Sequence, residues 1–211
     1  MSKMAGKRKI KGKIIIISSP SGGGKTSICR GLLRRNKRAG WEFSVSVTTR
    51  KRRPNEKDGR EYRFVSHAEF KQMQDRGDFA ESCKVHQYYY GTLRKPLEKV
   101  LYAGGVMLLD IDVKGAGRIK SLYPSAATIF ILPPGKRDLI RRLKKRGTED
   151  DKSLRIRRRR ALSEMKLYKR FEYTVINKNL NTAVDEVEMI IKSLHCRKNN
   201  LDLEQIARIV G

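Results

Sequence analysis

The sequence predicts an α/β fold in which a parallel β-sheet is flanked by helices. Short apolar runs rich in β-branched residues, such as Ile14 to Ile17, recur along the chain, as buried central strands require. Segments with helical periodicity separate these runs, and this alternation favours parallel pairing of the strands. The polar-alternating strands within residues 61–91 differ from this pattern and indicate a small separate subdomain.

Each element follows from a local pattern in the chain. The first strand, 13–18, leads through a glycine-rich turn to a helix over 24–38, whose last turn is basic and precedes Gly40. Ser66 and Glu69 form a capping box that begins a helix to Arg76. The other predicted strands are 43–47, 62–65, 79–85, 88–91, 106–112, 127–132 and 173–176, and the other predicted helices are 93–103, 114–121, 136–169, 181–197 and 201–209.

Composition indicates a globular protein that stays in water. The 211 residues suffice for one substantial core, and the longest aliphatic run, Ile14 to Ile17, is far too short to cross a bilayer. Residues 1–11 are basic but no apolar signal region follows, so we expect a loose basic tail. The 3 cysteines are widely separated and form no CxxC motif, which favours the reducing cytoplasm.

The net charge is strongly positive. Lys and Arg number 49 against 22 Asp and Glu, giving a formal charge of +27, and such a field attracts polyanions of any kind. Nucleotides and RNA both qualify. Because the chain has no RNP-type aromatic motif, no GXXG motif of the KH kind and no zinc knuckle, we expect nucleic-acid binding to be incidental at most.

The most informative motif follows the first strand, where residues 19–26 read Ser-Pro-Ser-Gly-Gly-Gly-Lys-Thr. The three glycines carry no Cβ and can adopt positive φ, so that successive amides converge on one anion at a helix N-terminus. Lys25 is then expected to reach the β- and γ-phosphates of a nucleotide, and the Thr26 hydroxyl to bind Mg²⁺. Ser19 departs from the glycine that begins the G-x-x-x-x-G-K-[ST] pattern, and a chance glycine-rich turn is the alternative.

Two carboxylates end an apolar strand. The carboxyl ends of parallel strands open onto the ligand crevice, and Asp110 and Asp112, spaced by two, are predicted to share one face of their strand. Either one can hold Mg²⁺ through water or hydrogen-bond a nucleotide base. Asp112 can instead cap the helix that begins near Lys114.

Arginines gather in two segments, as phosphoryl transfer requires cations around the phosphate oxygens. Arg50 and Arg53 lie on a polar loop, and Arg142, Arg146 and Arg157 lie on the basic helical stretch. Arginine binds phosphate bidentately. For at least two of the four consecutive arginines at 157–160, a solvated helix face is the alternative.

These residues resemble the guanylate kinase family, from about Gly12 to His195. The matching segments include 19–26, 44–50, 89–91, 109–112, 131–134, 142–143, 146–148 and 175–177, together with Arg53, Glu56, Gly59, Tyr62, Phe64, Val65, Ser66, Glu81 and Arg157. The resemblance implies a P-loop NTPase-type parallel sheet flanked by helices, with an inserted mixed GMP-binding subdomain and a helical lid. It also implies transfer of the γ-phosphate of ATP to GMP and dGMP, giving ADP and GDP, with Mg²⁺ accompanying ATP.

The resemblance further implies a role for individual residues. The expected catalytic residues are Lys25, Arg53, Arg146 and Arg157. The expected ATP contacts are Ser19, Pro20, Ser21, Gly22, Gly23, Gly24, Lys25, Thr26, Arg142, Arg146 and Asn177. The expected GMP contacts are Ser46, Arg50, Arg53, Tyr62, Glu81, Tyr90, Thr92 and Asp112, and the metal site is expected at Thr26 and, through water, Asp110.

The implied organisation has several parts. The core comprises 12–47, 98–135 and 159–197, the GMP-binding subdomain 48–97, the lid 136–158, and a C-terminal helical extension 198–211 follows. Lys114 and Lys178 stand where the family usually has Gln and Asp. A non-catalytic domain of this family, an RNA-associated basic protein and a kinase for another nucleoside monophosphate remain alternatives, and the choice between monomer and homo-oligomer stays open.

Overall fold

The computed structural model describes residues 12–54, 56–60, 62–85, 87–145, 151–197 and 208. The predicted basic tail, Arg146 and nearly all of the C-terminal extension lie outside these residues. The strands are β1 (Lys13–Ser18), β2 (Trp41–Phe43), β3 (Ser46–Thr48), β4 (Tyr62–Phe64), β5 (Phe79–Val85), β6 (Tyr88–Leu93), β7 (Val106–Asp110), β8 (Ala127–Leu132) and β9 (Tyr173–Ile176). The helices are α1 (Lys25–Asn36), η1 (Lys37–Ala39), α2 (His67–Asp75), α3 (Arg94–Tyr102), α4 (Val113–Leu122), α5 (Lys136–Lys145), α6 (Asp151–Met165), η2 (Lys166–Arg170), α7 (Leu180–Ser193) and η3 (Leu194–Cys196).

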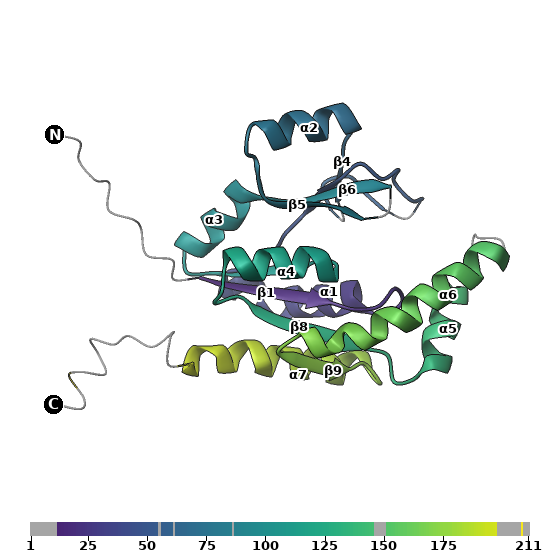
Figure 1. Ribbon diagram of the computed structural model, residues 1–211. Helices are drawn as coiled ribbons and strands as arrows, with labels where there is room; N and C mark the ends of the chain where they lie inside the picture. Colours follow the sequence, from purple (N-terminus) through teal and green to yellow (C-terminus); the bar gives the residue numbers. More distant parts are fainter. Residues whose placement is uncertain are drawn as a thin grey trace.

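A five-stranded parallel sheet forms the centre of the molecule, with the strand order β2-β7-β1-β8-β9 (Figure 1). The predicted parallel sheet flanked by helices is therefore confirmed. β1 lies between β7 and β8, and its register places Ile17 beside Asp110. Ligands of such sheets bind beyond the carboxyl ends of the strands, where the connections diverge to opposite sides. The loop after β1 begins at this point.

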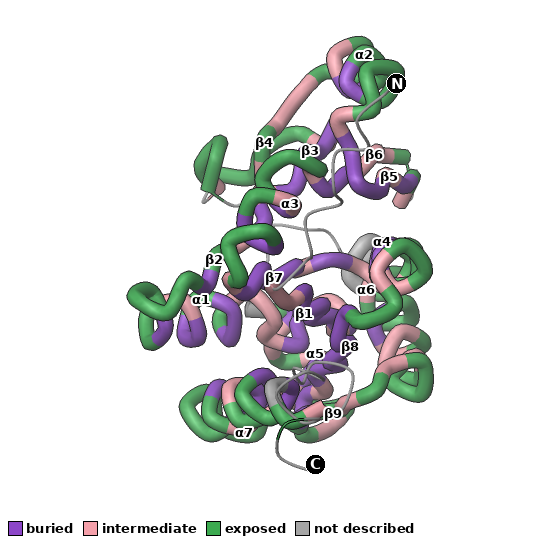
Figure 2. The backbone as a smooth tube through the Cα atoms, turned by 90° about the vertical axis from the view of Figure 1, so that its left-hand side faces the viewer, coloured by how far each residue is buried: buried purple, intermediate pink, exposed green. Residues whose placement is uncertain are grey.

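The alternation of side chains along β1 divides the core into two layers. Ile15 and Ile17 pack with residues of α1 and α7 on one face, whereas Ile14 and Ile16 pack with residues of α3 and α4 on the other. Successive side chains of a strand point to opposite faces, and all four isoleucines are buried because helices cover both faces. The buried trace runs through the middle of the molecule in Figure 2.

A second, four-stranded sheet has the order β4-β3-β6-β5 and mixes parallel and antiparallel pairs. It lies above the core sheet in Figure 1, with α2 on its outer side. Its small apolar core contains Val47, Phe70, Met73 and Phe79. The capping box is confirmed in part, because Ser66 accepts a hydrogen bond from the Glu69 amide at 3.1 Å.

The helices α5 and α6 lie together at one end of the core, on the right of Figure 1. Leu139 and Leu143 of α5 pack with Ala161 of α6 in a separate hydrophobic cluster. In the parts of the chain that the structure describes, none of the helices has both the length and the apolar composition that a bilayer-crossing segment needs.

Three sequence predictions are wrong in detail. The predicted helix 136–169 is not one helix, because the structure has α5, α6 and η2 in this range. The extended segment 43–47 is two strands, because Phe43 pairs with Leu108 in the core sheet while Ser46 pairs with Tyr62 in the second sheet. Asp112 lies beyond the end of β7 rather than on it, so the two aspartates do not share a strand face. The alternative of a helix cap is confirmed, since Asp112 Oδ1 accepts from the Gly115 amide at 2.9 Å.

We expect Leu108→Ala to lower the free energy of unfolding by about 2–5 kcal/mol, since it removes a fully buried side chain from the centre of the sheet. The matched control is Leu122→Ala, because that side chain is 58% exposed, and we expect a change within about 0.5 kcal/mol. Urea denaturation measures both. Equal losses in the two variants would contradict the assignment of the core.

Candidate active site

The loop between β1 and α1 forms the predicted phosphate cradle, and its backbone requires glycine. Gly22 and Gly24 have φ of 87° and 99°, in a region that residues with a Cβ rarely adopt. Gly23 is required by space, because a Cβ there would lie 2.7 Å from the Cβ of Ser19. Gly24 precedes the first turn of α1, which contains no acidic residue. The free amides at the start of α1 therefore favour an anion in this loop.

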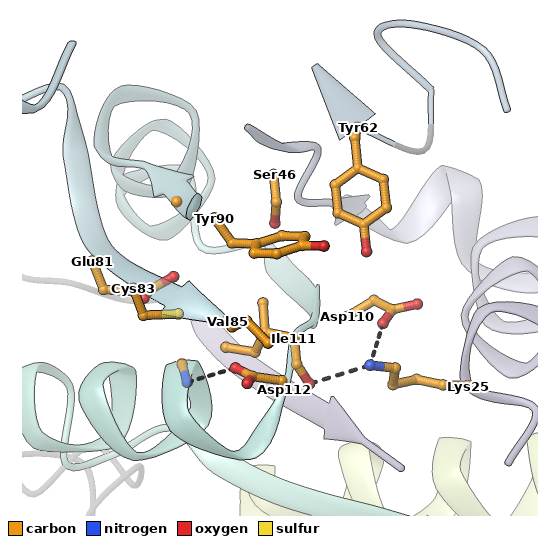
Figure 3. Close-up of a pocket in the computed structure, with 12 residues that line it drawn as sticks. Lys25, Ser46, Tyr62, Glu81, Cys83, Val85, Tyr90, Asp110, Ile111 and Asp112 are labelled. Carbon is orange, nitrogen blue, oxygen red and sulfur yellow. Dashed lines mark hydrogen bonds and ion pairs between the residues drawn. The ribbon is translucent and has the colours of Figure 1, made fainter. Parts of the chain in front are cut away.

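Lys25 and Thr26 meet Asp110 at the end of β7. The Lys25 Nζ lies 2.7 Å from Asp110 Oδ1 and donates to the carbonyl oxygen of Ile111 at 3.3 Å (Figure 3). The Thr26 hydroxyl donates to Asp110 Oδ2 at 3.0 Å. Burial is the largest single effect and would lower the pKa of Lys25, but the charge and hydrogen bond of Asp110, together with Tyr62 and Cys29, outweigh it and the pKa is raised. Lys25 is therefore a cation at neutral pH.

Thr26 and Asp110 together present oxygen donors of the kind that Mg²⁺ prefers. Within the described ranges, no three His, Cys, Asp or Glu side chains gather into a metal site. Mg²⁺ bound to a nucleotide needs only one or two protein oxygens, because water and phosphate supply the others. The pair therefore fits the predicted metal site.

Two side chains outside the loop, one following β9 and one on α5, donate hydrogen bonds to the backbone of the cradle. Asn177, which follows β9 and is 5% exposed, donates from Nδ2 to the carbonyl oxygen of Gly23 at 3.1 Å. Arg142 of α5 donates to the same oxygen at 3.4 Å and to the carbonyl oxygen of Asn177 at 3.0 Å. A Cβ on Gly24 would collide with Asn177. Arg142 and Asn177 thus lie at the loop, and their contact with ATP stays a prediction.

A cavity of about 180 Å³ extends from Lys25 to the second sheet. It is lined by residues of both sheets and of the turn into α4, drawn in Figure 3. The lining residues are Lys25, Ser46, Tyr62, Glu81, Cys83, Val85, Tyr90, Gly91, Asp110, Ile111, Asp112 and Gly115. Seven of the sequence-predicted site residues therefore line a single cavity: Lys25, Ser46, Tyr62, Glu81, Tyr90, Asp110 and Asp112.

Glu81 is the most unusual group in the cavity. Glu81 is only 7% exposed, and its Oε1 accepts a hydrogen bond from the Thr92 hydroxyl at 2.8 Å. Oε2 is buried and has no hydrogen-bond partner in the described part of the chain. Burial raises the pKa of this carboxyl, and the nearby charge of Asp112 raises it further. A buried acceptor without a donor is costly, so the arrangement suits a ligand that supplies N–H groups.

Aromatic rings and a carboxylate fix Arg50 near the cavity. Its guanidinium donates to both carboxylate oxygens of Glu56, at 2.8 and 3.0 Å, and lies 5.5 Å from the ring centre of Tyr62 and 5.7 Å from that of Phe64. Burial raises the pKa of Tyr62 to about 12, so its hydroxyl stays protonated. The Arg53 amide also donates to Glu56, but the Arg53 side chain is 62% exposed.

The other predicted residues take different positions. Thr92 is fully buried and touches the cavity only through Glu81. Arg157 is half-buried on α6 and is not among the cavity-lining residues, and Arg146 lies outside the described residues. The departures Lys114 and Lys178 are both exposed.

Sequence reasoning missed Cys83, Val85, Gly91, Ile111 and Gly115 of the cavity wall. Two of them could have been found, because residues two and four positions after Glu81 share its face of the strand. Burial raises the pKa of the Cys83 thiol to about 12, and the charges of Asp112 and Glu81 add to the shift. Ile111 lies in the turn between β7 and α4, where neither strand nor helix periodicity predicts the direction of a side chain.

A glycine loop that opens a helix beyond a central parallel strand, facing a cavity with a buried carboxylate, defines a P-loop nucleotide-binding protein with a second ligand site. The family model described as "Guanylate kinase" matches residues 11–194. The chain belongs to the guanylate kinase family.

Individual proteins give the same result. The chain is 45% identical to the guanylate kinase of Nitrosomonas europaea over 180 residues, which cover 85% of this chain and 89% of that protein. It is 42% identical to the guanylate kinase of Buchnera aphidicola over 197 residues, covering 90% and 95%. The crystal structure of guanylate kinase from Anaplasma phagocytophilum superposes with a TM-score of 0.72 at 27% identity, covering 92% of this chain and 98% of that one.

We expect Glu81→Gln to stabilise the ligand-free protein at neutral pH. The raised pKa of Glu81 means that the folded state prefers the protonated carboxyl, so wild-type stability falls as pH rises from the unfolded-state pKa through the folded one. Below the unfolded-state pKa, near pH 4, the two proteins should be equally stable, and above the folded pKa the variant should unfold at a higher temperature. Thermal denaturation between pH 4 and 8 tests this, and a stability difference that is constant across the series would contradict it.

Proposed function

We propose that this guanylate kinase binds ATP at the loop 19–26 and GMP in the cavity between the two sheets, and that the γ-phosphate passes between them to give ADP and GDP. The observation that carries the proposal is the cavity itself. It is bounded by Lys25 and Asp110 beside the cradle and by Glu81 and Asp112 farther away. A nucleoside monophosphate with its phosphate toward Lys25 and its base toward Glu81 matches this distribution of charge.

Glu81 and Asp112 are proposed to recognise guanine. Thr92 occupies Oε1 of Glu81 and fixes the side chain, which leaves Oε2 for a ligand donor. Guanine presents N1–H and a 2-amino group side by side, whereas adenine presents an acceptor at N1 and only a hydrogen at C2. A site built to pair with such donors rejects an analogue that lacks them by large factors, because its buried acceptors are left unpaired.

The phosphate of GMP is proposed to lie among the hydroxyl groups of Ser46, Tyr62 and Tyr90, all of which line the cavity. Arg50 adds a guanidinium whose position is fixed by Glu56. Arg53, whose side chain is exposed, is proposed to bridge the phosphates of acceptor and donor. Hydroxyl donors and guanidinium groups form charge-assisted hydrogen bonds with phosphate.

On the donor side, the amides of the cradle and Lys25 are proposed to bind the triphosphate, with Arg142 and Asn177 behind the loop. Arg146 and Arg157 are proposed to approach the transferred group from the lid. Phosphoryl transfer depends mainly on positioning and on cations around the equatorial oxygens. Closure of the units 48–97 and 136–158 would exclude water and favour GMP as the acceptor over hydrolysis.

Mg²⁺ is the proposed cofactor of ATP. The Thr26 hydroxyl would hold it directly and Asp110 through water, and their contact at 3.0 Å places both oxygens on one side of the cradle. The ion would neutralise charge on the phosphate oxygens. Asp110 also keeps Lys25 in place.

We also propose that dGMP is an acceptor and that the enzyme works in the cytoplasm. None of the proposed contacts involves the ribose 2′-hydroxyl, which is the group that dGMP lacks. Cys29, Cys83 and Cys196 are free thiols, and free thiols persist in reducing compartments.

Lys25→Ala or Arg53→Ala should reduce kcat by about 10²–10³-fold, the usual loss when one charge-stabilising donor is removed from an active site. A coupled assay of ADP release with ATP, GMP and Mg²⁺ measures the loss, and circular dichroism checks that the variants fold. The control is Lys99→Ala on the exposed side of α3, for which we expect wild-type activity. A folded, fully active Lys25→Ala variant would refute the role of the cradle, and an inactive wild-type protein would instead favour a non-catalytic binding domain.

Glu81→Gln should raise the KM for GMP by about 10²-fold or more, because an amide replaces an acceptor with a donor that faces the donors of guanine. The KM for ATP should change little. Turnover with GMP, dGMP, AMP, CMP and UMP in wild type and variant gives the specificity ratios. If the variant keeps the wild-type preference for GMP over AMP, Glu81 does not read the base.

A further inference from the structure

The crest of the cradle, residues Ser21 and Gly22, is held from outside by the two helices α5 and α6. The Ser21 amide donates to the Oε2 of Glu164 on α6 at 3.0 Å. Gly22 lies against α5, where an added Cβ would be 3.3 Å from Leu143 and 3.4 Å from Leu139. The crest is therefore fixed by one hydrogen bond and one apolar contact, both from helices more than a hundred residues away in sequence.

The part of the molecule that carries Glu164 is itself well packed. Leu139, Leu143 and Ala161 form the buried cluster between α5 and α6, with Leu162 and Met165 packed against it. Glu164 thus lies in the same turn of α6 as two residues of this cluster. Packing of this cluster fixes α6, and it therefore fixes the position at which the Glu164 carboxylate accepts the hydrogen bond from Ser21.

A carboxylate beside a phosphate-binding loop repels the bound phosphates, so its presence there indicates a specific structural task. The preceding turn of the same helix contains the four arginines 157–160, whose positive charges offset part of this repulsion. Hydrogen bonds from a backbone amide to a carboxylate are stronger than those to a neutral acceptor. The bond to Ser21 gives Glu164 that task, because it fixes the amide of a loop whose other amides must converge on the phosphates.

Glu164 also shares a helix face with a proposed catalytic arginine. Arg157 and Glu164 are seven residues apart, which is close to two turns, so their side chains leave α6 in nearly the same direction, about 10 Å apart along the axis. Arg157 is half-buried. A helix fixed to the cradle at Glu164 therefore sets the distance between the cradle and Arg157.

We propose that Glu164 is a positioning residue for phosphoryl transfer. Its carboxylate holds the Ser21 amide and so fixes the crest of the phosphate cradle to α6, which presents Arg157 to the donor phosphates. This inference deepens the proposed function and rests on it. It assigns Glu164 no contact with either nucleotide.

The test compares Glu164→Gln with Glu164→Met. Both variants are uncharged and similar in size, but only glutamine can accept the hydrogen bond from Ser21. We expect Glu164→Gln to retain kcat/KM for ATP within about threefold and Glu164→Met to lose about tenfold, which corresponds to about 1.4 kcal/mol. The KM for GMP should stay within about twofold in both, because the acceptor cavity does not include Glu164.

Amide hydrogen exchange at Ser21 supplies a readout that does not depend on activity. Exchange should be faster in Glu164→Met than in wild type or Glu164→Gln, because only the methionine variant leaves this amide without its acceptor. Glu188→Met is the matched control, since Glu188 pairs with Arg35 and Lys192 rather than with the cradle, and it should leave both measurements unchanged.

Equal kcat/KM values for the Gln and Met variants, or unchanged Ser21 exchange in the Met variant, would overturn the inference. A fall in GMP affinity equal to that for ATP would do the same, because it would indicate a general loss of structure. If the wild-type enzyme itself failed to phosphorylate GMP, the proposed function would fall. The exchange measurement would still decide whether Glu164 fixes the loop.

Discussion

The pairing of β1 with β7 is the constraint on which the site depends. The register sets Ile17 beside Asp110, so the chain leaves β1 for the glycine loop next to a carboxylate at the end of the neighbouring strand. As α1 begins, Lys25 and Thr26 return to the same carboxylate. A shift of this register by one residue would exchange the side chains of β1 between the two helix layers, and it would separate the cation and hydroxyl from Asp110. Core packing and site geometry are therefore fixed by one set of backbone hydrogen bonds.

In a chain with 22 acidic residues against 49 basic ones, the acidic residues near the cleft each have an identifiable partner or place. Glu56 holds a guanidinium, Asp110 holds an ammonium group, and Glu164 holds a backbone amide. Among the acidic residues that the structure describes, Glu81 alone keeps a buried oxygen without a donor. Positive charge is general on this protein and attracts any polyanion, whereas the few carboxylates near the cleft each have a specific position.

Local patterns in the sequence predicted most of the core. The strands 13–18, 127–132 and 173–176 agree with β1, β8 and β9, because a buried strand covered on both faces leaves a continuous β-branched run. The glycine loop was predicted from its own residues, because three consecutive glycines followed by Lys and Thr are typical of a phosphate-binding turn. The break between β2 and β3 was missed because the chain changes sheets there, and strand partners far away in sequence decide which sheet each residue joins. Glu164 was missed for the same reason, since its partner Ser21 is 143 residues away and no spacing along α6 indicates it.

The thiol in the cavity between the two sheets has a consequence for inhibitor chemistry. Cys83 is 6% exposed and its pKa is about 12, so at physiological pH almost none of it is the thiolate that attacks electrophiles. A reactive warhead aimed at this wall would find a poor nucleophile, however well its scaffold fitted. Reversible compounds with N–H donors directed at the neighbouring carboxylate address the chemistry that the cavity offers.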